Sequence, residues 1–270
     1  MSETVAEPTL VVEPPDISHI VTEDDEPVDN IYSAKQQRLL VETLYTSWQL
    51  DRPFVADANV GIFSTTRQPP LVPDMFLSLD VTIAEDWYAK ENRSYFLWEF
   101  GKPPDVVVEV VSNKKGGEAD RKLREYARMR IAYYAIYDPL QQVQSEDLRV
   151  YELYVSEYVP QADNFLQKIG LELVLWDGIY EAKAGIWLRW RDANGVLLPT
   201  GAEAAQAAQE QAAQAQEQAA QAQEQAAQAQ EQAAQERERA ERAEQVAAEA
   251  QLRAERLAAQ LRALGIEPEG

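Results

Sequence analysis

Two neighbouring stretches of the chain decide the fold: PDVVVEVVS at residues 104–112 and DRKLREYARMRIAYYAIYDP at residues 120–139. The first is mostly valine, which is typical of a strand covered on both faces. The second begins with a helical pattern over about residues 118–130 and continues into an aromatic strand that Asp138 and Pro139 close. A strand, a helix and a second strand in this order predict a mixed α/β fold.

Further elements flank this unit on both sides. A helix is expected over about residues 34–49, followed by the β-like runs FVADANVGIF at 54–63 and DMFLSLDVTI at 74–83. Three more β runs come later: LRVYELYV (148–155), LELVLWDGIYEA (171–182) and GIWLRWRD (185–192). The order lacks the repeated βαβ units of a doubly wound nucleotide-binding fold, and neither a GxGxxG motif nor a Walker P-loop is present.

Composition divides the chain into three parts. Residues 1–33 hold four prolines, nine acidic residues and no Lys or Arg, which predicts a disordered leader. All aromatic residues precede residue 191, so the packed core belongs to an α/β domain at residues 34–200. Residues 201–270 contain no aromatic residue and repeat EQAAQAQ with a period of seven, which predicts a long helix.

The heptads of residues 201–270 also indicate a coiled coil. One heptad position holds alanine from Ala212 to Ala254 and then Leu261, and a second position, three residues further on, is apolar except at Glu236. Four leucines gather at the far end, where association should be firmest: Leu252, Leu257, Leu261 and Leu264. Gly265 should end the helix. We therefore expect a homo-oligomer through residues 201–270, the alternative being a single solvated helix that acts as a spacer.

The residue inventory excludes several kinds of chemistry. Cysteine is absent and the one histidine, His19, lies in the leader, so thiolate or histidine zinc sites and a Ser/His/Asp triad are excluded from the domain. Carboxylates, Lys, Tyr, Ser or a hard metal ion held by oxygens remain. The chain has neither a run of about 20 apolar residues nor the pattern of a signal peptide. We expect a cytoplasmic protein without membrane contact.

Charge limits the affinity for nucleic acid. The formal net charge is −21, but most of it lies in the two ends, and residues 34–200 hold twenty-four acidic and nineteen basic residues. Because Lys and Arg supply most of the affinity for phosphates, this nearly balanced domain predicts weak or transient contact with nucleic acid.

Two carboxylates stand out in the strands. Asp74 follows Pro73 at the start of a strand, and Glu109 is the only charged residue between Asp105 and Lys114. Alternation places Glu109 on the same face as Val107, opposite to the face of Val106, Val108 and Val110. A carboxylate in so apolar a strand is costly unless it is paired, hydrogen-bonded or bound to a metal. Two such carboxylates can hold Mg²⁺ and leave positions for water and phosphate.

These residues also carry a family resemblance. The two stretches quoted first, together with LVPDMFLSLDV at residues 71–81, resemble the signature of the Uma-two family of restriction-endonuclease-like proteins, over about residues 34–190. That family is similar to the PD-(D/E)XK nuclease superfamily, whose core has the order αβββαβ. The resemblance therefore implies a restriction-endonuclease-like αβββαβ core with extra C-terminal strands.

The resemblance also implies roles for single residues. Asp74 corresponds to the aspartate of the superfamily motif and Glu109 to the acidic residue of its (D/E)XK element. Val111 stands where the superfamily has lysine, and in this family the lysine lies on the following helix, here as Lys122. Tyr126 lies one turn from Lys122 and should share its face. The implied site has Mg²⁺ or Mn²⁺ on Asp74 and Glu109, with Lys122 assisting.

Each of these assignments has an alternative. Asp74 could be a turn residue that begins a strand, Glu109 could be a buried acid paired with Arg121, and Lys122 could be an ordinary solvated lysine. Two further lysines, Lys114 and Lys115, compete for its role because their loop follows the Glu109 strand directly.

Two other acids could contact the metal. Asp105 is expected to have a structural role in the turn before its strand, with metal contact as the alternative. Glu42, on the first helix, is expected on a solvated face, with metal binding as its alternative.

We therefore expect a metal-dependent endonuclease that hydrolyses phosphodiester bonds, with DNA a better substrate than RNA. A hypothesis of a different class is a catalytically inactive scaffold or binding module that oligomerises through its C-terminal coiled coil.

Overall fold

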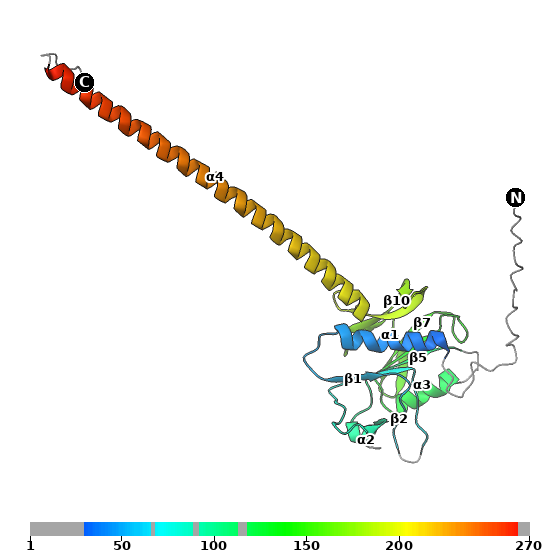
Figure 1. Cartoon of the computed structure of the whole chain (residues 1–270). Coiled ribbons are helices and arrows are strands. Elements are labelled where there is room, and N and C mark those ends of the chain that lie inside the picture. Colours follow the sequence, from blue (N-terminus) through cyan, green and yellow to red (C-terminus); the bar gives the residue numbers. More distant parts are fainter. Residues whose placement is uncertain (1–29, 66–67, 89–91, 113–117, 264–270) are drawn as a thin grey trace, which may run out of the picture. The chain divides into compact units, whose positions relative to one another are not determined.

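The structure is a computed structural model that describes residues 30–65, 68–88, 92–112 and 118–263 (Figure 1). The chain divides into two compact units between Ala204 and Ala205. Several residues weighed from the sequence lie outside the described ranges: His19, Lys114, Lys115, Leu264 and Gly265.

A six-stranded sheet forms the centre of the first unit, with the order β1-β3-β5-β6-β7-β8. Its strands are β1 (Phe54–Asp57), β3 (Met75–Leu79), β5 (Val106–Val110), β6 (Tyr133–Tyr137), β7 (Leu148–Tyr154) and β8 (Glu157–Pro160). Strands β5 and β6 are parallel and are joined by helix α3 (Glu118–Arg128), whereas all other neighbours in this sheet are antiparallel. With helix α1 (Ile31–Ser47) in front, the order αβββαβ is present, so the predicted fold class is confirmed.

The valine strand β5 is buried on both faces, as its composition predicts. Val106, Val108 and Val110 pack in a cluster with α1 and with the hairpin of β10 (Leu171–Tyr180) and β11 (Lys183–Asp192), to which β9 (Phe165–Leu166) adds a third strand. Val107 packs on the opposite face, in the cluster that includes Tyr126 of α3. Alternation along β5 therefore assigned the two faces correctly.

Polar side chains attach α1 to the hairpin. The helix begins at Ile31, three residues before the expected start, because the side chain of Asn30 accepts a 2.8 Å hydrogen bond from the Ser33 amide and caps it. Buried Gln36 donates to the Leu188 carbonyl at 2.8 Å and accepts from the Leu188 amide at 3.0 Å. The backbone edge of β11 is thereby satisfied by a helix side chain.

Two of the expected strands are shorter than the sequence pattern. The run at 54–63 breaks at Asn59, which has a φ of 55°, into β1 and the short β2 (Ile62–Phe63). The run at 74–83 ends at Leu79, because Asp80 adopts a φ of 60°. Strand β2 pairs in parallel with β4 (Tyr95–Phe96), which leads into helix α2 (Leu97–Phe100). This small layer was not predicted.

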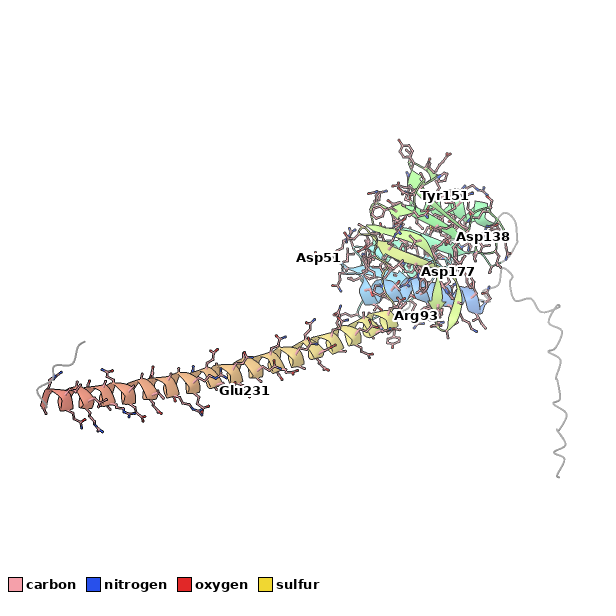
Figure 2. The ribbon with its side chains drawn as sticks, turned by 90° about the horizontal axis from the view of Figure 1, so that it is seen from above. Asp51, Arg93, Asp138, Tyr151, Asp177 and Glu231 are labelled. Atoms are coloured by element: carbon pink, nitrogen blue, oxygen red, sulfur yellow. The ribbon has the colours of Figure 1, made fainter. Side chains whose placement is uncertain are left out.

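Helix α4 (Gly201–Ala263) is the long helix that the heptads predict. Its residues from Ala205 onward belong to the second unit, and their side chains are almost all exposed (Figure 2). Glutamine and glutamate four residues apart bond along the helix, as Gln221 does with Glu217 at 3.3 Å. Within the described residues, no helix is long and apolar enough to cross a membrane.

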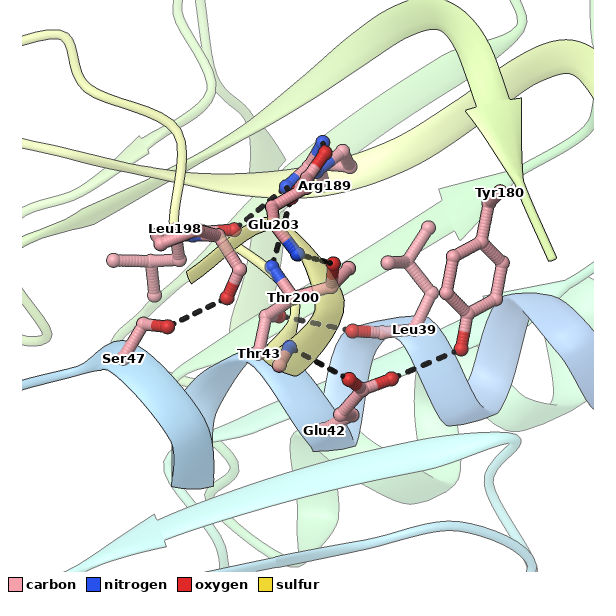
Figure 3. A network of polar contacts seen from close by, with 11 residues as sticks. Leu39, Glu42, Thr43, Ser47, Tyr180, Arg189, Leu198, Thr200 and Glu203 are labelled. Atoms are coloured by element: carbon pink, nitrogen blue, oxygen red, sulfur yellow. Dashed lines mark hydrogen bonds and ion pairs between the residues drawn. The ribbon is translucent and has the colours of Figure 1, made fainter. Parts of the chain in front are cut away.

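The first turn of α4 belongs to the first unit and is fixed there by a buried arginine (Figure 3). Arg189 donates to both carboxylate oxygens of Glu203, at 2.9 and 2.7 Å, and to the Leu198 carbonyl at 2.8 Å. Thr200 and Glu203 bond to each other's backbone amides, the reciprocal arrangement of a capping box.

Candidate active site

Asp74 and Glu109 are brought together by the register of two antiparallel strands. Met75 of β3 lies opposite Val108 of β5, and one further step of the same register places Asp74 opposite Glu109. Both residues share a face with Phe76 and Val107, which is the face that α3 covers. The two carboxylates selected from the sequence are therefore neighbours in space.

The carboxylate of Asp74 is held at both oxygens. Oδ2 accepts a 2.7 Å hydrogen bond from the Val110 amide, and Oδ1 accepts a 2.7 Å hydrogen bond from Nε2 of Gln37 on α1. Gln37 is itself oriented, because its Oε1 accepts from Nδ2 of Asn59 at 2.9 Å. Helix, sheet and the turn after β1 thus fix this side chain jointly.

The carboxylate of Glu109 is held by two side chains of α3. Nζ of Lys122 lies 2.8 Å from Oε2, and the hydroxyl of Tyr126 donates to Oε1 at 2.7 Å. Glu109 is 8% exposed and Tyr126 is fully buried. Lys122 and Tyr126 lie one turn apart on the same face of α3, as expected, and both side chains therefore reach the same carboxylate.

Burial and mutual repulsion of the carboxylates shape the protonation of the site. Loss of hydration, together with the charge of Glu109, raises the pKa of Asp74 to about 7, although the Val110 amide, Lys122 and Gln37 lower it. Burial, followed by the charge of Glu109, also raises the pKa of Tyr126 well above its usual range, so its hydroxyl stays a donor.

The oxygen atoms of this pair suit a hard divalent cation. Each carboxylate oxygen has two lone pairs, so an oxygen that accepts one hydrogen bond can still coordinate a metal. A cation would also relieve the repulsion that raises the pKa of Asp74. Among the described residues, no group of three or more His, Cys, Asp or Glu could hold a metal. Mg²⁺ often binds through one or two carboxylates, with water and phosphate completing its shell, so two carboxylates are compatible with it.

The structure places two of the other candidate residues, Arg121 and Asp105, away from this pair. Arg121 does not pair with Glu109; it is exposed and lies 3.9 Å from Glu125 on the same helix. Asp105 precedes the opposite end of β5, where it accepts from the Leu79 amide at 2.8 Å and pairs with Lys102.

Glu42 has a structural role that neither alternative anticipated (Figure 3). Its carboxylate accepts from the Tyr180 hydroxyl at 3.1 Å and from the Gly201 amide at 2.9 Å, so it binds the N-terminus of α4. It is neither on a solvated face nor in contact with Asp74 or Glu109 through any bond described.

Gln37 was missed at the sequence level, although a signal for it exists. The apolar stripe of α1 includes Leu40 and Leu44, and continuing it backwards by three and seven residues reaches Gln37. Gln36 and Gln37 are both buried. Polar residues on the buried stripe of a helix need partners, which here are the hairpin backbone and Asp74.

Comparisons with known proteins identify the family of the chain. A family model described as "Putative restriction endonuclease" matches residues 25–179, more than half of the chain, and confirms the resemblance that the motifs indicated. Among solved structures, the chain is similar to a protein from Anabaena variabilis described as "a putative nuclease belonging to DUF820". That similarity has 14% sequence identity and a TM-score of 0.36, and covers 52% of this chain and 72% of the other. A comparison with curated proteins found no match.

Proposed function

The chain belongs to the Uma2 family of restriction-endonuclease-like proteins, and we propose that it is a metal-dependent endonuclease whose site is built from Asp74, Glu109 and Lys122. The observation that carries the proposal is the pairing of Asp74 and Glu109 on one face of the sheet, with Lys122 2.8 Å from Glu109. A partly buried acidic pair with an adjacent cation is an arrangement suited to phosphodiester hydrolysis.

Asp74 and Glu109 would hold Mg²⁺ or Mn²⁺. Such an ion, when bound, supplies Lewis acidity toward water and neutralises charge on the phosphate. The surrounding residues keep the two carboxylates in place: the Val110 amide and Gln37 orient Asp74, and Tyr126 orients Glu109. These contacts come from strand β5 and from helices α1 and α3, so the pair is preorganised rather than assembled on binding.

Lys122 is the cation that would act on the substrate. Its side chain is 16% exposed, so the ammonium is partly shielded from water and interacts strongly with nearby negative charge. From its position beside Glu109 it would stabilise the charge that develops on a phosphate bound at the pair. Lys114 and Lys115 lie outside the described residues, so the choice among the three lysines belongs to mutagenesis.

The substrate would be nucleic acid, and the family description favours DNA over RNA. The balance of charge in residues 34–200 supplies little attraction to phosphates, so we propose weak or transient binding. A second copy of the chain could raise the effective affinity. The heptads of α4 would associate with another α4, because Leu252 and Leu257 are 57% and 52% exposed in the single chain.

One observation favours the alternative of an inactive scaffold. All four oxygens of Asp74 and Glu109 accept hydrogen bonds from the protein itself, so the pair is satisfied without a metal. Calorimetric titration with Mn²⁺ separates the two functions, because a scaffold of this kind would fold normally and take up no ion.

The endonuclease proposal is tested by cleavage of DNA with Mg²⁺ or Mn²⁺. Wild-type protein should nick DNA, and Glu109→Gln should abolish the activity while EDTA abolishes it in the wild type. Glu125→Gln is the matched control, because Glu125 lies on α3 and pairs with exposed Arg121 instead of the site. Equal activity of Glu109→Gln and wild type would remove the mechanism.

A further inference from the structure

A second feature of this face is a cavity of about 350 Å³ between the sheet and the layer of β4 and α2. Five of its twelve lining residues are aromatic: Phe76, Trp87, Tyr88, Tyr95 and Phe100. The polar lining residues are Asp57, Asn92, Arg93 and Ser94. We call this cavity the aromatic pocket.

The aromatic pocket lies next to the acidic pair. Phe76, which lines it, is two residues from Asp74 along β3 and on the same face, a separation of about 7 Å at the usual rise of a strand. Asp57, another lining residue, lies opposite Phe76 in the register of β1 and β3. A group bound in the pocket would therefore lie within about one nucleotide of a phosphate at Asp74 and Glu109.

One wall of the pocket is a stack of two aromatic rings. Phe100 stacks on Tyr95, with ring centroids 4.2 Å apart and an interplanar angle of 6°. The Tyr95 hydroxyl lies 2.8 Å from the Ser78 hydroxyl and donates to the Lys102 carbonyl at 3.0 Å, so this ring is fixed. Trp87 and Tyr88 are 56% and 72% exposed, which leaves two further rings open to solvent at the same cavity.

The polar side chains at the pocket could form hydrogen bonds with the edge of a base. Asp57 brings a carboxylate acceptor, and Asn92 brings an amide that is both donor and acceptor. Arg93, which also lines the pocket, donates from Nε to the Tyr88 carbonyl at 2.7 Å, and this bond restrains its guanidinium. Flat rings combined with a few such groups match the chemistry by which proteins bind unpaired bases.

We propose that the aromatic pocket receives one unstacked nucleobase of the nucleic acid strand held at Asp74 and Glu109. This inference rests on the proposed function and adds to it a preference for single-stranded or locally unpaired substrate. The volume lies at the small end of the range for small-molecule sites and is sufficient for one base.

The charge of the domain supports the same conclusion. With twenty-four acidic and nineteen basic residues in residues 34–200, contacts to phosphate contribute little affinity. Stacking of a base on aromatic side chains contributes about 1–3 kcal/mol per base and does not require a basic surface. A stacking pocket next to the acidic pair would add affinity for a strand whose phosphates the domain attracts only weakly.

Binding is tested with the full chain and a short fluorescein-labelled DNA oligonucleotide, by fluorescence anisotropy in EDTA, where metal-dependent cleavage cannot occur. The single strand should bind more tightly than its duplex, and Trp87→Ala should weaken single-strand binding by about fivefold or more, the equivalent of one stacked base. Trp87→Phe should retain most of the affinity. Trp98→Ala is the matched control, because Trp98 is 46% exposed and contacts Phe96, with ring centroids 5.0 Å apart, without lining the pocket.

Three outcomes would overturn the inference: tighter binding of the duplex than of the single strand, equal affinity of Trp87→Ala and wild type, or equal losses in Trp87→Ala and Trp98→Ala. Circular dichroism of each variant shows that it is folded. Cleavage with Mn²⁺ is measured separately. If the wild type cleaves DNA but Trp87→Ala binds the single strand as tightly as wild type, the endonuclease proposal stands and the pocket proposal fails. If Trp87→Ala weakens binding but the wild type does not cleave, the pocket proposal stands and the endonuclease proposal fails.

Discussion

Replacing Lys122 with Met should destabilise the domain and abolish DNA cleavage. Nζ of Lys122 lies 2.8 Å from Oε2 of Glu109, and the two side chains are 16% and 10% exposed. Removing one partner of such a buried pair leaves the other charge uncompensated, which costs about 3–5 kcal/mol in unfolding free energy. Tyr126 still donates to Glu109 in the variant, so we expect the lower part of that range.

Urea denaturation of Lys122→Met, Arg121→Met and wild type measures this cost. Arg121 is the adjacent residue on α3, and its 3.9 Å pair with Glu125 is exposed, so Arg121→Met should cost less than about 1 kcal/mol. Both substitutions remove one positive charge from the same turn of helix. The difference between them therefore isolates the contact with Glu109.

Titration with Mn²⁺ separates a catalytic lysine from a purely structural one. Losing the Lys122 charge should leave the Mn²⁺ affinity of the folded variant unchanged or higher, because a cation next to Glu109 repels the metal. Cleavage should nevertheless be lost. Equal stability of Lys122→Met and Arg121→Met, or full cleavage by Lys122→Met, would refute the role given to this residue.

Three further predictions concern the metal, the base of α4 and its free end. The pKa of Asp74 is raised to about 7, so below that pH a proton bound to Asp74 competes with the metal. The Mn²⁺ affinity measured by calorimetry should therefore rise about tenfold from pH 6 to pH 8. An affinity that does not change with pH would contradict Asp74 as a ligand. Arg189→Met should lower the free energy of unfolding in urea by about 2–3 kcal/mol, because it removes the bonds to Glu203 and Leu198. Arg191→Met is the control: it removes a more exposed ion pair with Glu172 and should cost less than half as much. Leu257→Asp should shift the chain toward monomer in sedimentation equilibrium, and an unchanged mass would assign α4 to the single-helix alternative.

The sequence predicted the central elements because their patterns are strong and local. The valine run of β5 is recognisable as a buried strand, and alternation along that strand is enough to assign Glu109 to one of its faces. The seven-residue repeat likewise predicts α4, because no other regular structure has that period. These features depend on neighbours along the chain.

Features that depend on contacts distant in the chain were not predictable in the same way. The pairing of Asp74 with Glu109 depends on the register of β3 against β5, and nothing in either strand alone determines that register. Glu42 has an ordinary helical sequence around it, yet its partners are Tyr180 and Gly201, more than a hundred residues away. Its capping role therefore became visible only in the structure.

Turns were the other source of error. Asn59 and Asp80 have positive φ values of 55° and 60°, and they end strands that the apolar pattern would extend. Asn and Asp tolerate this conformation better than other residues with side chains, but nothing marks the particular Asn or Asp that adopts it. The layer of β2, β4 and α2, and with it the aromatic pocket, follows from the first of these breaks.

The central claim is that Asp74 and Glu109 jointly bind a divalent cation. The most direct measurement is a crystal of the protein soaked in Mn²⁺, with anomalous scattering recorded at the manganese edge. The account predicts a peak within coordination distance of a carboxylate oxygen of both residues, about 2.0–2.3 Å, lost when the soak is repeated with Glu109→Gln. Well-diffracting crystals with both side chains ordered and no peak between them would contradict it.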